Sequence, residues 1–166
     1  MNIQDLHLIY DYYYWTNAKI LAKTAMVSHE QFIAPASFPY GGLRGTLAHI
    51  LEAERGWRSR FQSLGEAAEM FPDDFPTPAF LEAGMQEEEK AMRAYLASLH
   101  DEDLAGHLRY TPGDGKPRDR ILWQSLYHLA NHGTQHRSEA AALLTDYGHS
   151  PGDLDFNVFL AETGKS

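Results

Sequence analysis

The amino-acid sequence predicts an all-α protein, a four-helix bundle with a long crossover connection and a short β-hairpin before the last long helix. Four segments carry apolar residues at alternating spacings of four and three, the pattern of a helix that buries one face. An acidic, proline-rich stretch separates the second segment from the third and is typical of a long surface connection. With 166 residues, 43% of them hydrophobic, the chain suits one domain over residues 1–166.

The first two helices are predicted over residues 3–26 and 43–64. Prolines and glycines between positions 35 and 42 interrupt regular structure, because proline lacks an amide donor and glycine is entropically costly in a helix. The stripe of the first helix consists of Leu6, Tyr10, Tyr13, Asn17 and Ile20. The stripe of the second consists of Leu43, Leu47, Ile50, Glu54, Trp57, Phe61 and Leu64.

The third and fourth helices lie on either side of the predicted hairpin. After the connection at residues 65–78, Thr77 and Pro78 open the third helix as a cap followed by proline at the first helical position, and Leu99 closes its apolar face. Residues 107–117 contain a glycine turn and predict two short strands. The fourth helix is predicted over residues 118–147, where Gly148 is well placed to end it.

Three of the nine histidines lie in the fourth helix at four-residue spacing. His128, His132 and His136 therefore project from one face, and two adjacent rings can share a metal ion. His136 also falls in the apolar stripe, so its ring is expected in the core, where an unpaired polar group costs about 1–3 kcal/mol. A hydrogen bond to a carbonyl or a tyrosine would satisfy a single buried ring. A pair of histidines four residues apart favours a metal, with a third ligand from elsewhere.

The second helix offers candidates for that site. His49 lies beside the apolar stripe and next to small residues, among them Ala53 and Gly56, so that this flank has room for a ligand or for a neighbouring backbone. Taken alone, His49 is typical of a half-exposed surface histidine, and Glu52 and Glu54 are typical of solvated or paired charges. Because the fourth helix offers a histidine pair, His49, Glu52 and Glu54 become candidates for a site shared with that pair.

Composition excludes several functions. Fourteen basic against twenty-three acidic residues give a net charge of −9, which argues against nucleic acid as a partner, since its phosphates require a basic surface. The chain has no cysteine, so that histidine, carboxylate and water must hold any metal. No apolar run reaches membrane-spanning length, and the N-terminus lacks the pattern of a signal peptide. We expect a cytoplasmic protein with no membrane partner.

In order and spacing, these motifs resemble the DinB superfamily, the DinB/YfiT-like group of proposed metalloenzymes. The resemblance covers nearly the whole chain. The matching features are His49 with Glu54 and Trp57, residues 108–111 before a glycine turn, His128, residues 131–137, and Pro151 with Asp155. The family often has Gly-Gln after the final His-Arg, where this chain has Ser138 and Glu139. The implied fold is the four-helix bundle of DinB/YfiT-like type with a crossover.

The resemblance implies a metal site made of His49, His132 and His136. These residues would bind one divalent metal ion, zinc or nickel, and leave coordination positions for water or substrate. Three neutral imidazoles leave the charge of the ion largely uncompensated, so that it can acidify a bound water or thiol. Glu54 or Glu139 could orient or deprotonate that group. His128 is the reserve candidate for a ligand, and the resemblance also implies a homodimer.

Three functions remain as alternatives. Characterised relatives include bacillithiol-dependent S-transferases and mycothiol-dependent isomerases, so the resemblance favours a metal-dependent transferase that uses a low-molecular-weight thiol and a small-molecule substrate. A metal-dependent hydrolase would use the same site with a bound water. A non-catalytic, stress-related metal-binding protein would show no turnover. Histidine ligands suit zinc, nickel, copper and iron alike, so the ligand set leaves the metal open.

Overall fold

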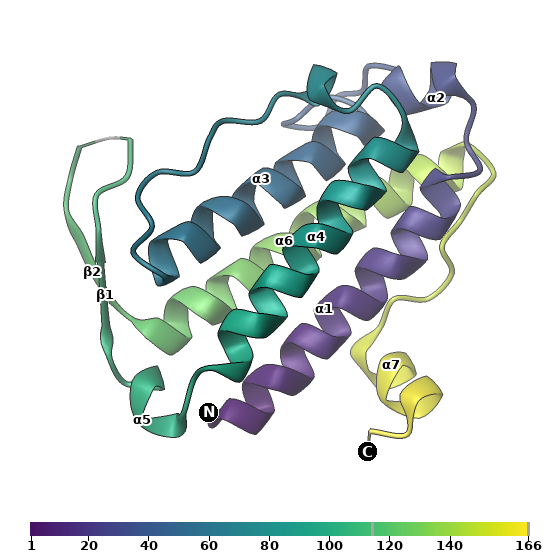
Figure 1. The fold of residues 1–166 in the computed structure, drawn as a ribbon. Helices are drawn as coiled ribbons and strands as arrows, with labels where there is room; N and C mark the ends of the chain where they lie inside the picture. The colour runs from purple at the N-terminus through teal and green to yellow at the C-terminus, as the bar shows by residue number, and fades with distance from the viewer. Residues whose placement is uncertain (114, 166) are drawn as a thin grey trace.

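Four long helices lie side by side in the computed structural model, which describes residues 1–113 and 115–165 (Figure 1). They are α1 (Ile3–Thr24), α3 (Leu43–Phe61), α4 (Pro78–Ala97) and α6 (Leu122–Asp146). Helices α1 and α3 each pack against both α4 and α6. Within the described residues the chain is mostly helical, with one two-stranded antiparallel sheet, which confirms the predicted helical class and the predicted hairpin.

The connection between α3 and α4 returns along the length of α3, so that these two helices run in the same direction (Figure 1). Helices α1 and α6 run in the opposite direction. The returning segment is the long connection predicted at residues 65–78, and it contains one short 3-10 helix, η1 (Pro72–Asp74). The buried side chain of Phe75, directly after η1, anchors this segment in the core.

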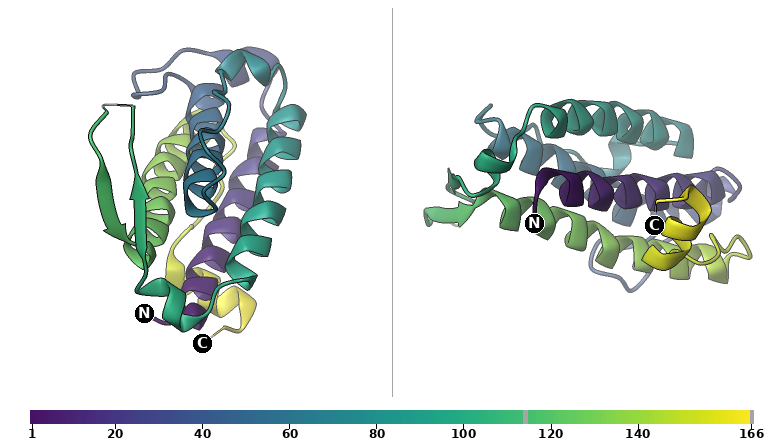
Figure 2. Two further views of the ribbon diagram at one scale, coloured as in Figure 1. Left: turned by 60° about the vertical axis from the view of Figure 1, so that its left-hand side comes forward. Right: turned by 90° about the horizontal axis from the view of Figure 1, so that it is seen from below.

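The hairpin is longer at its second strand than predicted. Strand β1 (His107–Tyr110) pairs with β2 (Arg118–Ile121), and the hairpin stands beside α6 and α3 (Figure 2). Helix α6 therefore begins at Leu122 and not at residue 118, because residues 118–121 bond to β1 and the Leu122 amide donates to the Gly106 carbonyl at 2.8 Å. Asp114, in the predicted glycine turn, lies outside the described residues.

Other helix boundaries also differ from the predicted ones. Helix α3 ends at Phe61 instead of residue 64, because Ser63 adopts a φ of 55°, which a right-handed helix does not allow. Three short helices were not predicted: α2 (His29–Ile33), α5 (Asp101–Leu104) and α7 (Phe156–Thr163). Helix α7 packs against α1.

The apolar stripes of the four long helices meet in one core. Among its most buried side chains are Leu6, Tyr10, Ile20, Leu43, Leu47, Leu51, Leu81, Met92, Leu126, Leu129 and Ala140. His136 lies among them and is only 3% exposed, as its place in the stripe predicted. Burial of a ring with two nitrogens in such a core requires partners for both.

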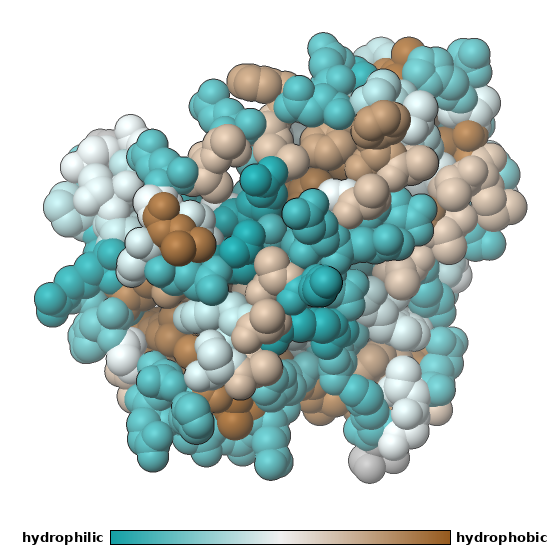
Figure 3. Space-filling view, viewed as in Figure 1, coloured by the Kyte–Doolittle hydropathy of each residue, from teal (hydrophilic) through white to brown (hydrophobic). Residues whose placement is uncertain are grey.

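One face of the molecule is largely polar, with hydrophobic residues gathered in one area. Charged and polar residues dominate the face shown in Figure 3, and hydrophobic residues gather there over the end of α4 that is nearest to η1. Phe80, in the first turn of α4, and Phe71, directly before η1, are both exposed. No helix in the described part of the chain combines the length and the apolar character needed to cross a lipid bilayer.

Replacing Gly133 with alanine is expected to destabilise the protein by about 1–3 kcal/mol, because Tyr13 of α1 packs directly against Gly133 of α6 and overpacking is costly. A Cβ at Gly133 would lie 2.3 Å from Cε2 of Tyr13, which is 1% exposed and has no room to move, and 2.7 Å from Nη1 of Arg137. Urea denaturation measures the loss. The control is Gly113→Ala, where a Cβ meets nothing within 4 Å; equal stability of the two variants would contradict the close approach.

Candidate metal centre

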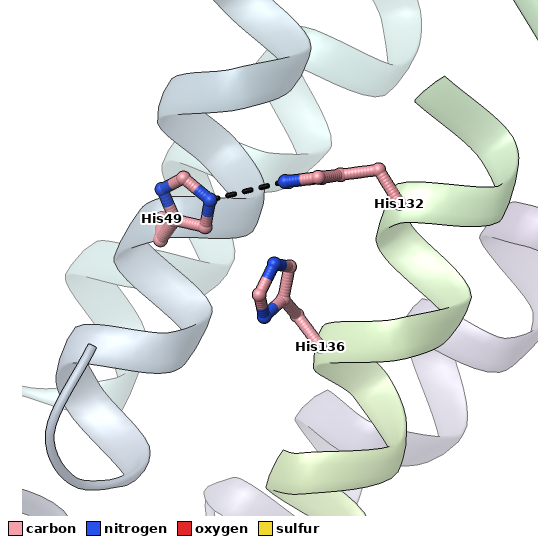
Figure 4. A group of neighbouring side chains, drawn as sticks. All are labelled: His49, His132 and His136. Atoms are coloured by element: carbon pink, nitrogen blue, oxygen red, sulfur yellow. Dashed lines mark hydrogen bonds between the residues drawn. The ribbon is translucent and has the colours of Figure 1, made fainter. Parts of the chain in front are cut away.

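Three histidines from two helices point toward one another (Figure 4). His49 comes from the second turn of α3, and His132 and His136 come from successive turns of α6. One ring nitrogen of each lies within 4.8 Å of the corresponding atom of the other two. The structure therefore brings together the three residues that the sequence and its family resemblance predicted as ligands.

The nitrogen separation between His49 and His132 fits a shared divalent ion. Two imidazole nitrogens bound at about 2.0–2.1 Å to a tetrahedral ion lie roughly 3.3 Å apart. The Nε2 atoms of His49 and His132 are 3.1 Å apart, a distance that also suits a hydrogen bond between two neutral rings. The ring of His136 meets both of the others edge-on, with centroids 4.5 Å from His132 and 4.8 Å from His49. One ion would satisfy all three rings, whereas one hydrogen bond satisfies only two.

Two carboxylates lie behind these rings. Oε2 of Glu139 is 2.8 Å from Nδ1 of His136, and Oε2 of Glu52 is 3.6 Å from Nδ1 of His49. Each glutamate follows its histidine by three residues, a spacing that makes the two side chains neighbours on a helix. The carboxylate of Glu139 at Nδ1 orients the ring of His136 and leaves its Nε2 free for a ligand. Glu52 has the same His-x-x-Glu spacing, but at 3.6 Å its carboxylate lies near Nδ1 of His49 without a hydrogen bond to it.

Burial keeps two of the imidazoles neutral. The pKa of His49 and that of His132 are each lowered to about 4, mainly by burial and further by the neighbouring His136. The Nδ1 atoms of both rings are buried without a hydrogen-bond partner among the described residues. Because a metal competes with protons for imidazole nitrogens, neutral rings at pH 7 are ready to bind one.

Tyr40 covers the cluster from the loop before α3. Its ring stacks on His49, with centroids 3.4 Å apart and planes 10° apart, and meets His136 edge-on at 5.2 Å. The loop can approach α3 this closely because residue 45 is glycine: a Cβ there would lie 2.0 Å from the carbonyl oxygen of Tyr40. In the sequence this loop is marked only by prolines and glycines, so that nothing indicated a role for Tyr40.

Two other predicted candidates have different surroundings. Glu54 is 1% exposed, and its carboxylate accepts hydrogen bonds from the hydroxyls of Tyr14 at 2.6 Å and Tyr13 at 3.3 Å, both on α1. Burial raises the pKa of Glu54 to about 7. His128 is exposed and packs on Trp57, with its ring centroid 6.0 Å from that of His132. Of the two predicted glutamates, the structure brings Glu139 to the cluster and directs Glu54 to α1.

A cavity of about 590 Å³ adjoins the cluster. His49 and His132 line it, together with α3, the start of α6, the segment after α3 and the end of β1. Neither His136 nor Tyr40 lines it, so a molecule in the cavity would approach the cluster from the side of His49 and His132. The size suits a small organic ligand.

The fold and the cluster define a class, a mostly helical protein with a candidate three-histidine metal site. A sequence model of the DinB family matches residues 1–165, and the chain belongs to the DinB family. It is similar to Protein DinB of Bacillus subtilis (strain 168), with 23% identity over 161 residues, which are 93% of this chain and 93% of that protein. The family predicted from the motifs is thereby confirmed.

Proposed function

We propose that this protein binds one divalent metal ion through His49, His132 and His136 and is a metal-dependent enzyme of the thiol S-transferase type. The observation that supports the metal is the convergence of three imidazoles within 4.8 Å. The observation that supports catalysis is the cavity beside His49 and His132. Zinc and nickel are the proposed ions, and the proposed architecture around them is the four-helix bundle of DinB/YfiT-like type.

When bound by neutral imidazoles, such an ion acidifies a coordinated thiol or water enough to give a nucleophile near neutral pH. The protein's own residues prepare the site for this. Glu139 orients the ring of His136 through Nδ1, and the ring of Tyr40 shields one face of His49 from water. The cavity leaves the side of His49 and His132 accessible to a thiol and a small electrophile. Because the chain has no cysteine, the thiol must come from a cosubstrate.

The test is a screen of electrophiles with and without a panel of small thiols, using protein loaded with zinc or nickel. We expect consumption of an electrophile that requires a thiol, and loss of both turnover and bound metal in the His132→Ala variant. Turnover of esters or amides without thiol would indicate that the protein is a hydrolase that uses the same site. Metal binding without turnover on either panel would indicate a non-catalytic metal-binding protein. Activity that survives in metal-free His132→Ala would contradict the metal-dependent mechanism.

We also propose that the protein forms a homodimer. The exposed Phe80, in the first turn of α4, and the exposed Phe71, directly before η1, offer apolar surface that a second copy would cover. Analytical ultracentrifugation measures the mass in solution, and a monomer at all concentrations would contradict this proposal.

A further inference from the structure

The cavity beside the histidines continues along a wall of aromatic rings. From His132 the wall passes to His128, with centroids 6.0 Å apart, and then to Trp57 at 5.2 Å. The ring of Tyr110, at the end of β1, meets Trp57 edge-on at 5.4 Å. All four residues line the cavity, which therefore offers an apolar surface that leads away from the metal ligands.

Arg60 lies at the end of this wall. Its guanidinium carbon is 5.3 Å from the ring centroid of Trp57 and 5.8 Å from that of Tyr110. Gly56, one turn earlier in α3, leaves room for it, because a Cβ at Gly56 would lie 3.3 Å from Nη1 of Arg60. Two aromatic rings and this gap hold the guanidinium in a defined place within the lining of the cavity.

Arg60 differs in charge pairing from Arg58, two residues earlier on α3, and from Arg109 in the same cavity. Arg58 donates to Glu88, and Arg109, which also lines the cavity, donates to Asp119 at 3.0 Å. Within the described part of the chain, Arg60 has no ion-pair partner. A planar guanidinium with free N–H groups is suited to bind a carboxylate through two parallel hydrogen bonds.

We propose that this cavity binds an organic monocarboxylate with an aromatic or apolar body. Its carboxylate pairs with Arg60, its body lies on Trp57 and Tyr110, and its other end reaches toward His49 and His132. This assignment rests on the proposed function only in that the end near the histidines is the reacting end. The carboxylate subsite itself requires no metal.

The charges around the cavity disfavour more than one negative charge on the ligand. Glu52, Glu66 and Glu69 line the same cavity, and the chain as a whole has a net charge of −9. One unpaired cation compensates one carboxylate, whereas a dianionic phosphate would keep an uncompensated charge among these glutamates. The ligand class is therefore a monocarboxylate.

The experiment compares 4-phenylbutyrate with its neutral analogue 4-phenylbutyramide by isothermal titration calorimetry. Metal-free protein is used first, because a carboxylate could otherwise bind directly to the metal. We expect the carboxylate to bind about tenfold more tightly than the amide, the advantage of a charge-assisted pair with a guanidinium. In Arg60→Gln this advantage should disappear, while the affinity for the amide stays the same because the aromatic wall is intact.

Arg120→Gln removes the same charge from the exposed β2 strand, outside the cavity lining, and should keep the full carboxylate preference. Equal affinities for the two probes in wild-type protein would overturn the proposal. So would a preference that survives in Arg60→Gln, or one that is lost in Arg109→Gln alone. A preference that appears only after metal loading and persists in Arg60→Gln would place the carboxylate on the metal, which overturns the subsite but leaves the proposed metal function standing. Conversely, if the protein binds no metal but still prefers the carboxylate to the amide, the proposed metal function is wrong and the carboxylate subsite stands.

Discussion

The His136→Ala variant is expected to lose tight binding of zinc or nickel, with an affinity lower by more than about 100-fold. Loss of an outer partner of a ligand alone costs about 10–100-fold, so loss of a ligand costs more. Of the three proposed ligands, His136 is held most firmly, since it is 3% exposed and its Nδ1 is fixed by Glu139. Competition with a chromophoric chelator measures the affinity. Thermal unfolding gives a second readout, because metal at about 100 times its dissociation constant stabilises a protein by roughly 2.7 kcal/mol, and this gain should vanish.

Two matched variants show whether the loss is specific. Glu139→Gln keeps all three rings and is expected to weaken metal binding by about 10–100-fold without abolishing it. His128→Ala removes an exposed histidine of the same helix, whose ring centroid is 6.0 Å from that of His132, and should leave the metal affinity unchanged. Wild-type affinity in His136→Ala together with loss in His128→Ala would show that the ligand set is wrong.

Titration of Glu54 is expected to make the unfolding free energy of the protein depend on pH. Its pKa is raised from the ordinary 4.5 to about 7 by burial, so that between these values the unfolded chain has lost a proton that the folded protein retains. Stability therefore falls as pH rises through this window. In Glu54→Gln this fall is absent. The difference in unfolding free energy between Glu54→Gln and wild type should therefore shift in favour of the variant, by on the order of 3 kcal/mol, between pH 4.5 and pH 8.

The unfolding free energies of wild type and Glu54→Gln are compared on metal-free protein, and the difference between them is followed as a function of pH. His49 and His132 act in the opposite sense: their pKa values are lowered from 6.5 to about 4, so the stability they contribute is present above pH 6.5 and is lost as pH falls toward 4. This contribution is common to wild type and variant and cancels in the difference. Urea denaturation at several pH values gives the two curves, and parallel curves would mean that Glu54 titrates as an ordinary carboxyl.

The sequence predicts those parts of the fold and site that depend on spacing within one helix. The four apolar stripes located the long helices, and the spacing of His132 and His136 placed both rings on one face with His136 in the core. The contact between His49 and His132 joins residues 83 positions apart. No local pattern encodes such a contact, so that His49 as a ligand came from the family resemblance.

Features that depend on long-range packing were not predicted. The sequence predicts that residues 118–121 belong to the last helix, because their pairing with β1 is not visible in a local pattern. The position of Tyr40 over His49 depends on how closely its loop can approach Gly45, which composition does not reveal. The orientation of Glu54 depends on two tyrosines of α1, which draw its carboxylate away from the histidines.

The chain path through the long connection has a consequence for the order of events during synthesis. His49 is made early, but its partners on α6 follow only after the returning segment, α4 and the hairpin. A growing chain that ends before α6 carries one of the three proposed ligands, and a single imidazole does not hold a divalent ion tightly. If these histidines bind the proposed ion, metal uptake follows the synthesis of α6, and a bound ion requires that α3 and α6 have already packed together.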